Sequence, residues 1–160
     1  MPSLALASTD GASVDLSTVE GTTVLYLYPM TGRPGVEQPA GWDFIPGARG
    51  CTAEACDFRD HFAELRSAGA SSVFGLSVQT TAYQREAVER LHLPFAMLSD
   101  SELSLAAPLH LPTFEAGGMR LYARLTLIVS DGIIVKAFYP VFPPHEHADE
   151  IINWLTSRQE

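Results

Sequence analysis

Thr22-Thr-Val-Leu-Tyr-Leu-Tyr28 is a continuous run of β-branched, aliphatic and aromatic residues that ends at Pro29. Such a run predicts a strand that is buried on both faces, as the strands of parallel sheets are. Ser72-Val-Phe-Gly-Leu-Ser-Val78 has the same character and predicts a second strand of this kind. The two runs decide the architecture because a helical pattern follows each of them.

The first helical pattern begins at Cys51. Apolar residues recur from there at steps of three and four, at Ala55, Phe58, Phe62 and Leu65, which predicts a helix that ends near Gly69. Residues 81–93 predict a second helix, halted by the proline at position 94. The short segments that follow predict a strand at 95–98 and one or two helical turns at 102–107.

The C-terminal third predicts a hairpin and a last helix. Leu121–Val129 and Ile133–Tyr139 are strand-like and are joined by Ser130-Asp131-Gly132, whose Asp-Gly pair supplies the positive φ angles of a tight turn. Residues 148–157 predict the final helix. Because β-α-β crossovers are right-handed, the order predicts an α/β fold with a central mixed sheet and helices on both faces. This order resembles the thioredoxin-like fold.

Length and composition indicate one domain over residues 1–160. With 46% hydrophobic residues the chain can form a core. Ten Lys and Arg against nineteen Asp and Glu give a net charge of −9, which excludes nucleic acid as an expected partner. No apolar stretch approaches the roughly 20 residues that span a bilayer, and no basic leader is seen. With two cysteines only, we expect a cytoplasmic protein without structural disulfides or membrane contact.

Cys51 follows an unusual loop. Residues 29–50 contain four prolines and five glycines, so no regular element is predicted there, and a connection of this length is typically functional. A cysteine at a helix start lies beside unpaired N–H groups and the positive end of the helix dipole. We therefore expect Cys51 to be a preformed thiolate.

Cys56 is the second thiol of the same predicted helix. Five positions correspond to ~7.5 Å of rise and ~140° of rotation, so the two Cα atoms lie more than ~8 Å apart. A disulfide tolerates at most about 7 Å. A bond between Cys51 and Cys56 would therefore require the start of the helix to unwind.

Other candidate sites are weaker. His145 and His147 lack a third metal ligand nearby, so we predict a solvated loop and no metal there. His61 is ten residues beyond Cys51 on one helix, ~15 Å of rise away, which excludes a Cys-His dyad. The Gly-rich loop lacks the Lys-Ser/Thr of a phosphate-binding motif. We predict no cofactor. Residues 139–144 are expected to cap a sheet edge near the mouth of the site.

One segment resembles a known family. Gly50-Cys-Thr-Ala-Glu-Ala-Cys-Asp-Phe-Arg59, together with Tyr28-Pro29, is similar to the active-site segment of peroxiredoxins, and its Cys-x4-Cys spacing resembles the peroxiredoxin Q or bacterioferritin-comigratory subgroup. Phe74-Gly-Leu-Ser77 and Arg124-Leu-Thr-Leu-Ile-Val-Ser-Asp-Gly132 extend the resemblance, which covers about residues 10–157.

The resemblance implies a thiol-dependent peroxidase that reduces hydrogen peroxide and small organic hydroperoxides. Cys51 would attack the peroxide and become a sulfenic acid, and Cys56 would resolve it as an intramolecular disulfide. Thioredoxin or a similar dithiol would then reduce that disulfide. The oligomeric state, monomer or homodimer, stays open.

The resemblance also implies roles around the sulfur. Arg124 would stabilise developing negative charge, and Glu54 would orient Arg124, although a carboxylate in the first turn of a helix is also favourable by itself. Backbone N–H groups of Gly50 and Cys51 would bind a peroxide oxygen, and Pro29 would shield the site from water.

The sequence departs from the family pattern Pro-x-x-x-Thr/Ser-x-x-Cys. Ala48 stands three residues before Cys51, where the pattern has a hydroxyl, and Phe44 stands seven before it, so about fifteen extra residues separate Pro29 from Cys51. We predict that Thr31 supplies the missing hydroxyl and that Arg49 adds positive potential.

Two other functions remain open. A disulfide oxidoreductase is disfavoured, because such enzymes place Cys-x-x-Cys at the helix start. A peroxide-sensing or partner-binding module on the same scaffold, without efficient turnover, stays as the alternative to a peroxidase.

Overall fold

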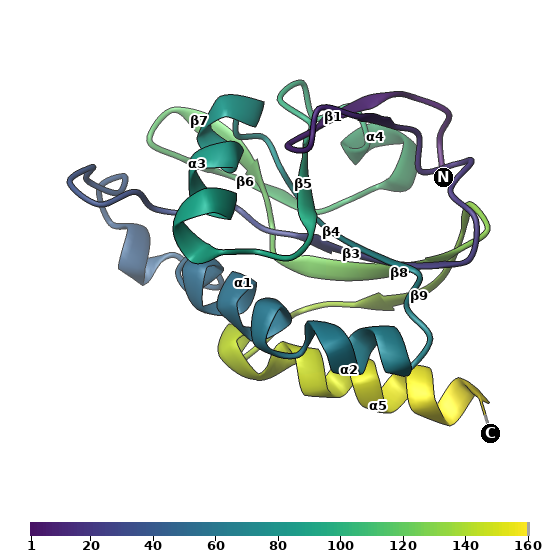
Figure 1. Cartoon of the computed structure of the whole chain (residues 1–160). Coiled ribbons are helices and arrows are strands. Elements are labelled where there is room, and N and C mark those ends of the chain that lie inside the picture. Colours follow the sequence, from purple (N-terminus) through teal and green to yellow (C-terminus); the bar gives the residue numbers. More distant parts are fainter. Residues whose placement is uncertain (160) are drawn as a thin grey trace.

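The computed structural model describes residues 1–159 and shows an α/β, thioredoxin-like fold (Figure 1). Its main sheet is mixed, with strand order β2-β1-β5-β4-β3-β8-β9, and β6 pairs with β7 in a separate hairpin. The strands are β1 Leu6–Ser8, β2 Ser13–Val14, β3 Thr22–Leu27, β4 Ser72–Ser77, β5 Ala96–Ser99, β6 Thr113–Ala116, β7 Met119–Tyr122, β8 Leu125–Ser130 and β9 Ile133–Phe138. The helices are α1 Cys51–Asp60, α2 Phe62–Ser67, α3 Thr81–Leu91, α4 Ala106–Leu109 and α5 His147–Gln159, with 3-10 turns η1 Trp42–Phe44 and η2 Pro144–Glu146.

The β3 strand lies in the interior of the sheet, next to the central strand β4. It runs parallel to β4 and antiparallel to β8, and the β8 register places Leu125 opposite Leu27. Arg124, one residue before β8, is therefore held beside the end of β3 from which the loop to Cys51 departs. The sheet thus brings residues 28, 51 and 124 toward one place.

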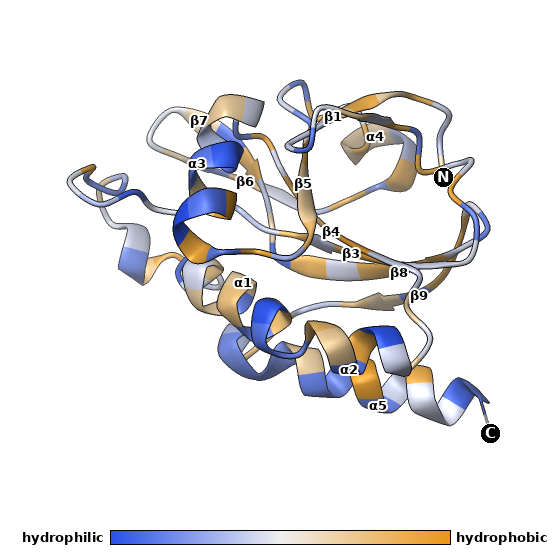
Figure 2. Cartoon of the chain, viewed as in Figure 1, coloured by the Kyte–Doolittle hydropathy of each residue, from blue (hydrophilic) through white to orange (hydrophobic). Residues whose placement is uncertain are grey.

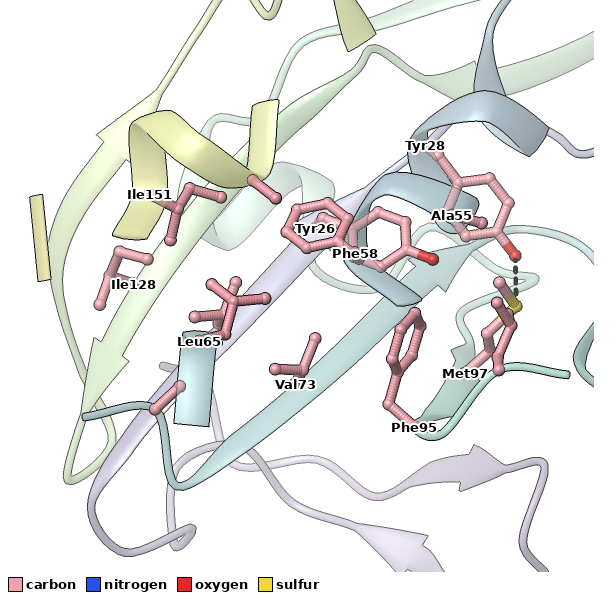
Figure 3. Packing of buried hydrophobic residues seen from close by; sticks show 14 of the residues in the cluster. Tyr26, Tyr28, Ala55, Phe58, Leu65, Val73, Phe95, Met97, Ile128 and Ile151 are labelled. Carbon is pink, nitrogen blue, oxygen red and sulfur yellow. Dashed lines mark hydrogen bonds between the residues drawn. The ribbon is translucent and has the colours of Figure 1, made fainter. Parts of the chain in front are cut away.

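Both faces of β3 are buried, as the sequence predicts. Val24, Tyr26 and Tyr28 pack in one core with α1, α2 and α5, and Tyr26 stacks on Phe58 with ring centroids 4.4 Å apart (Figure 3). Leu91 of α3 belongs to the same core. Leu25 and Leu27 of β3 belong to a second core on the opposite face, where α4 packs. Helices therefore lie on both faces of the sheet. The first face carries α1, α2, α3 and α5, and the opposite face carries α4.

The hydropathy pattern follows these layers. Hydrophobic colours run along the central strands, whereas α2 and α5 alternate between hydrophobic and hydrophilic residues (Figure 2). Ile151 and Leu155 of α5 are buried, and Asp149 and Glu150 of its first turn are exposed. This amphipathic pattern is what lets a surface helix cover a sheet. No helix among residues 1–159 is long and apolar enough to cross a membrane.

Three predicted elements need correction. The predicted helix 51–69 divides at His61, whose backbone leaves helical geometry (φ −110°, ψ 13°). The predicted strand 121–129 divides after Tyr122, because β7 pairs with β6 whereas β8 pairs with β3. The helical turns predicted at 102–107 lie instead at α4, Ala106–Leu109. Pro108 does not stop this helix, because it falls in the first turn, where a helix tolerates proline.

The β8–β9 hairpin matches the prediction. Asp131 and Gly132 have φ of 48° and 83°, the two positive values of the expected turn. A Cβ at Gly132 would collide with the carbonyl oxygen of Ser17, so the turn requires glycine for space as well as for conformation.

The loop of residues 29–50 is an ordered projection beyond the sheet (Figure 1). As predicted it has no regular element beyond one 3-10 turn. Trp42 and Ala48 are buried in a third, small core with Ala116 and Leu121 of the β6–β7 hairpin. Arg33 lies over the Tyr83 ring of α3 at 4.3 Å. The loop is therefore fixed to the body at several points.

Candidate active site

Cys51 is the first residue of α1, and Gly50 is its N-cap. Gly50 has φ of 105°, and a Cβ there would lie 2.5 Å from Cγ of Pro144. Only glycine fits this conformation and this close approach. The expected position of Cys51, at a helix start after a glycine, is confirmed.

Arg124 reaches the sulfur. Its Nη2 donates to Cys51 Sγ at 3.1 Å, and its Nη1 donates to Glu54 Oε1 at 2.7 Å. The side chains of Arg124 and Glu54 are 2% and 0% exposed, and Cys51 is 4% exposed. The structure therefore brings Cys51, Glu54 and Arg124 together in a buried cluster, as the family resemblance implies.

Backbone carbonyls complete the environment of the guanidinium. Nη2 also donates to the carbonyl oxygens of Arg49 at 3.0 Å and Ala48 at 3.1 Å, and lies 3.4 Å from that of Gly47. The end of the long loop thus holds Arg124. These carbonyl contacts have no side-chain signature, so the sequence offered no signal for them.

Burial determines the ionisation of Cys51. It raises the pKa of the thiol above its ordinary value, and the charge of Glu54 raises it further, while Arg124 and a hydrogen bond from the Met30 N–H lower it. The expectation of a preformed thiolate is therefore wrong for this closed conformation. Desolvation outweighs the helix start and the guanidinium.

Glu54 shows the same effect. Burial raises the pKa of its carboxyl group to about 7, although the charge and the hydrogen bond of Arg124 lower it. Its second oxygen, Oε2, has no hydrogen-bond partner among residues 1–159. Arg124 responds in the opposite sense: burial disfavours its charge, but Cys51 and Glu54 raise its pKa overall. One buried cation therefore faces two acids whose pKa values are both raised by burial.

Cys56 lies on the same unbroken helix α1 as Cys51, and both thiols are free. Cys56 is half-buried and packs against the main core. The separation expected from five helical positions therefore applies to this conformation. The two sulfurs can bond only after the first turns of α1 open.

Thr31 does not take the predicted role. It is fully buried, but its hydroxyl donates to Gln79 Oε1 at 3.2 Å, as does its backbone N–H at 3.0 Å. A hydroxyl has one hydrogen to donate, so Thr31 in this state has none for the sulfur of Cys51. Pro29 is buried directly after β3, before the Met30 N–H that contacts the sulfur.

Two hollows lie near the start of α1, one lined by Cys51 and the other by Gly50 and Arg124. One of about 220 Å³ is lined by Cys51 together with Met30, Gln38 and Trp42, and it is the direct opening to the thiol. A second, of about 470 Å³, is lined by Gly50 and Arg124 and by residues 141–145. Residues 141–144, part of the segment predicted near the mouth of the site, thus line the second hollow.

The histidines have three different settings. His61 contacts Asp57 just after α1, and His145 is exposed at the larger hollow. His147 is buried against Thr126, so the predicted solvated loop is wrong for this residue. Among residues 1–159 no group of three or more His, Cys, Asp or Glu side chains forms a cluster that could hold a metal ion.

The Redoxin family model matches residues 1–152. The chain belongs to the Redoxin family. Among its relatives, peroxiredoxin Q of Oryza sativa subsp. japonica chloroplasts is 30% identical over 158 residues, which are 98% of this chain and 64% of the plant protein. Peroxiredoxin Bcp of Escherichia coli is 29% identical, over 96% of this chain and 91% of the relative. The chain spans 64–65% of the length of the first plant relatives.

Solved structures agree with this Redoxin assignment. Peroxidoxin BcpB of Mycobacterium tuberculosis superposes with a TM-score of 0.75 at 25% identity, over 96% of this chain and 92% of that one. The peroxiredoxin Q of Xylella fastidiosa, solved as a cysteine-to-serine mutant, superposes with a TM-score of 0.77 at 21% identity, over 98% of this chain and 90% of that one. The resemblance to peroxiredoxin Q and Bcp proteins, and the thioredoxin-like fold, are both confirmed.

Proposed function

We propose that this Redoxin-family chain is a thiol-dependent peroxidase that reduces hydrogen peroxide and small organic hydroperoxides. The observation that carries the proposal is the guanidinium of Arg124, 3.1 Å from Cys51 Sγ at the start of α1. A buried sulfur beside a fixed cation is the arrangement that a nucleophilic thiolate and a departing oxygen anion both need.

In the first step the Cys51 thiol gives up its proton to solvent, and the thiolate that forms beside Arg124 attacks the terminal oxygen of a hydroperoxide. An S–O bond forms while the O–O bond breaks, and the departing alkoxide or hydroxide takes a proton to leave as alcohol or water. The sulfur is oxidised to a sulfenic acid and the peroxide is reduced. Negative charge passes from the sulfur to the leaving oxygen, within reach of Arg124.

The protonation state of Glu54 decides how much of the Arg124 charge is available to the sulfur. With a carboxyl pKa of about 7, Glu54 is in part protonated at neutral pH. A neutral Glu54 still accepts the Arg124 hydrogen bond through its carbonyl oxygen and leaves the positive charge to the thiolate. The N–H groups of Gly50 and Cys51, at the start of α1, receive the peroxide oxygen, and Pro29 shields the sulfur from water.

In the second step the Cys56 thiolate attacks the sulfenic sulfur, forming the disulfide and releasing hydroxide, which is protonated to water. The start of α1 must unwind first, because both cysteines occupy one helix. Thioredoxin or a similar dithiol then reduces the disulfide by exchange.

One chain carries all of these groups, so the proposed enzyme acts as a monomer or as a homodimer with complete sites. A reducing cytoplasm is the compartment we propose, because it keeps Cys51 and Cys56 as free thiols between turnovers.

Thiol counting after one equivalent of hydrogen peroxide tests the proposal. The wild type should lose both thiols rapidly, Cys56→Ser should stop at a sulfenic acid on Cys51, and Cys51→Ser should leave Cys56 largely unreacted. Slow or absent oxidation of Cys51 in the wild type would overturn the proposal.

A second assay separates turnover from sensing. The burial that raises the pKa of the Cys51 thiol favours the alternative of a sensor without efficient turnover. With thioredoxin, thioredoxin reductase and NADPH present, a peroxidase consumes many equivalents of peroxide. A sensor consumes one equivalent and stops.

A further inference from the structure

The three residues that follow Pro29 lie beside the sulfur of Cys51, and we call them the 30–32 segment. The Met30 N–H contacts the sulfur. Met30 and Gly32 line the opening of about 220 Å³ that also contains Cys51. Thr31, between them, is fully buried. The placement of this segment therefore determines both a contact of the sulfur and the shape of its opening.

Gln79 makes all the hydrogen bonds of Thr31 within residues 1–159. Its Oε1 accepts from the Thr31 N–H at 3.0 Å and from the hydroxyl at 3.2 Å, and its Nε2 donates to the Thr31 carbonyl oxygen at 3.1 Å. A primary amide has both a donor and an acceptor, so it can pair with the N–H and the C=O of one residue. Buried backbone groups need such partners. Gln79 therefore does for Thr31 what a neighbouring strand would do, at a point where β3 has ended.

Gln79 is itself held between two regular elements. It lies after the end of β4 and directly before Thr80, the N-cap of α3. Its backbone N–H donates to the Ser77 hydroxyl at 3.2 Å, and its carbonyl oxygen accepts from the Ser99 hydroxyl at 2.6 Å. The amide that binds Thr31 thus projects from a fixed backbone.

The ends of the 30–32 segment have separate anchors. Before it, the Tyr28 N–H donates to the carbonyl oxygen of Leu76 at 3.1 Å. At its end, Arg90 of α3 donates through Nη2 to the Gly32 carbonyl oxygen at 2.9 Å. Between these points, the planar peptide that joins residues 30 and 31 carries the N–H that Gln79 binds. Gln79 is therefore placed to set the orientation of Met30.

We propose that Gln79 is a positioning residue for Cys51: its amide holds Thr31 so that the Met30 N–H stays directed at the sulfur. The inference rests on the proposed function and adds to it a residue that acts through Thr31 and Met30 rather than by contact with the peroxide. A hydrogen bond to the charged form of a thiol lowers its pKa, and the Met30 N–H does so for Cys51. Loss of the Gln79 amide should therefore leave less thiolate at a given pH.

The test is the pH dependence of iodoacetamide alkylation of Cys51 in a Cys56→Ser background, which needs no peroxide. Gln79→Met removes all three contacts at similar side-chain volume, and we expect the thiol pKa to rise by roughly one unit. Below the thiol pKa, one unit means about tenfold less thiolate, so hydrogen peroxide should oxidise Cys51 about tenfold more slowly. Gln79→Asn keeps the amide but is one methylene shorter, and this milder variant should shift the pKa in the same direction.

Two matched controls separate positioning from stability. Gln84 is a fully buried glutamine whose amide donates to the Ser77 hydroxyl at 3.0 Å and to the Leu98 carbonyl oxygen at 2.8 Å. Gln84→Met should lower the urea midpoint of unfolding at least as much as Gln79→Met, but leave the thiol pKa unchanged. Thr31→Val removes the hydroxyl and keeps both backbone contacts with Gln79, so its thiol pKa should match the wild type.

Three outcomes contradict the inference. If both Gln79 variants keep the wild-type thiol pKa while the urea midpoint falls, Gln79 only stabilises the fold. If the pKa falls, the Thr31 hydroxyl released from Gln79 serves the sulfur better than the Met30 N–H does. If Gln84→Met raises the pKa equally, the effect is not specific to Gln79. A wild type that does not react with peroxide, with the expected pKa shifts still present, would instead refute the proposed function alone, so the two failures are distinguishable.

Discussion

Arg124 Nη2 has two hydrogens and four acceptors within 3.4 Å: the sulfur of Cys51 and the carbonyl oxygens of residues 47, 48 and 49. The sulfur therefore competes with backbone for one donor, while Nη1 is held by Glu54. Planar guanidinium geometry is what makes contacts on both nitrogens possible at once.

Replacing Arg124 by lysine preserves the charge but not this geometry. An ammonium group cannot contact Glu54 and the sulfur in the same two directions, so we expect Arg124→Lys to react with hydrogen peroxide about 100-fold more slowly. Single-turnover oxidation of Cys51 measures this rate. A rate within about threefold of the wild type would show that charge alone is sufficient.

Glu54→Gln separates the charge of Glu54 from its hydrogen bond. Glutamine keeps an oxygen for Arg124 Nη1 but removes the negative charge that raises the pKa of Cys51. The pKa of the thiol should therefore fall. The pH dependence of iodoacetamide alkylation, in a Cys56→Ser background, measures it. Glu64→Gln, an exposed carboxylate on α2, is the control that should leave it unchanged. A rise in the thiol pKa would contradict the role given to Glu54.

Cys51, at a helix start after Gly50, was predictable from the local pattern, whereas Glu54 and Arg124 were predictable only from the family resemblance. Sequence reasoning failed for Thr31, whose partner Gln79 is set by the path of a loop without periodicity. It also misjudged the thiol pKa, because burial depends on packing from three parts of the chain.

At the scale of elements, long periodic segments were predictable: β3, β4, α3, the β8–β9 hairpin and α5 all lie where hydrophobic patterning places them. The short β1–β2 pair and the β6–β7 hairpin were not predicted. Their strands have two to four residues, too few for alternation to be read, and their pairing is set by tertiary contacts.

Asp57 links α1 to α5. Its Oδ2 accepts from the backbone N–H of Ala148, in the first turn of α5, at 2.7 Å, and its Oδ1 lies 3.1 Å from His61 Nδ1. The carboxylate thus satisfies an unpaired N–H at a helix start from a neighbouring helix.

Removing this carboxylate should destabilise the packing of the two helices. We expect Asp57→Ala to lower the free energy of unfolding by about 1–2 kcal/mol, measured by urea denaturation. Asp60→Ala, on the same helix with a side chain 60% exposed, should change it by less than about 0.5 kcal/mol. Equal effects of the two variants would contradict a specific role for Asp57.

At the scale of the whole molecule, the net charge of −9 does not repel a hydroperoxide, which is neutral at about pH 7. The proposed chemistry depends on local cations instead, and Arg49 and Arg124 both line the hollow near the sulfur. The global charge bears on solubility and on charged partners, whereas the proposed reaction depends on the buried cluster of Cys51, Glu54 and Arg124.

The free energy of unfolding of the whole chain should depend on the ionisation of Glu54. Its folded pKa of about 7 exceeds its ordinary value of 4.5, so between these values the folded state binds more protons than the unfolded state. The free energy of unfolding should then fall as pH rises through this window, by about 3 kcal/mol relative to Glu54→Gln. Urea unfolding of both proteins at about pH 5 and about pH 8 measures the difference. If the free energies of unfolding of the wild type and Glu54→Gln changed by the same amount across this pH range, the raised pKa of Glu54 would be contradicted.

The insertion between β3 and α1 separates two tasks along the chain. Its last residues, 47–49, grip the guanidinium, whereas Asp43 and Phe44 before them face the neighbouring hollow and are exposed to solvent. Because the guanidinium is held by backbone carbonyls of residues 47–49 and not by the outer stretch, side chains at positions 43 and 44 can be exchanged without removing the contacts that fix Arg124.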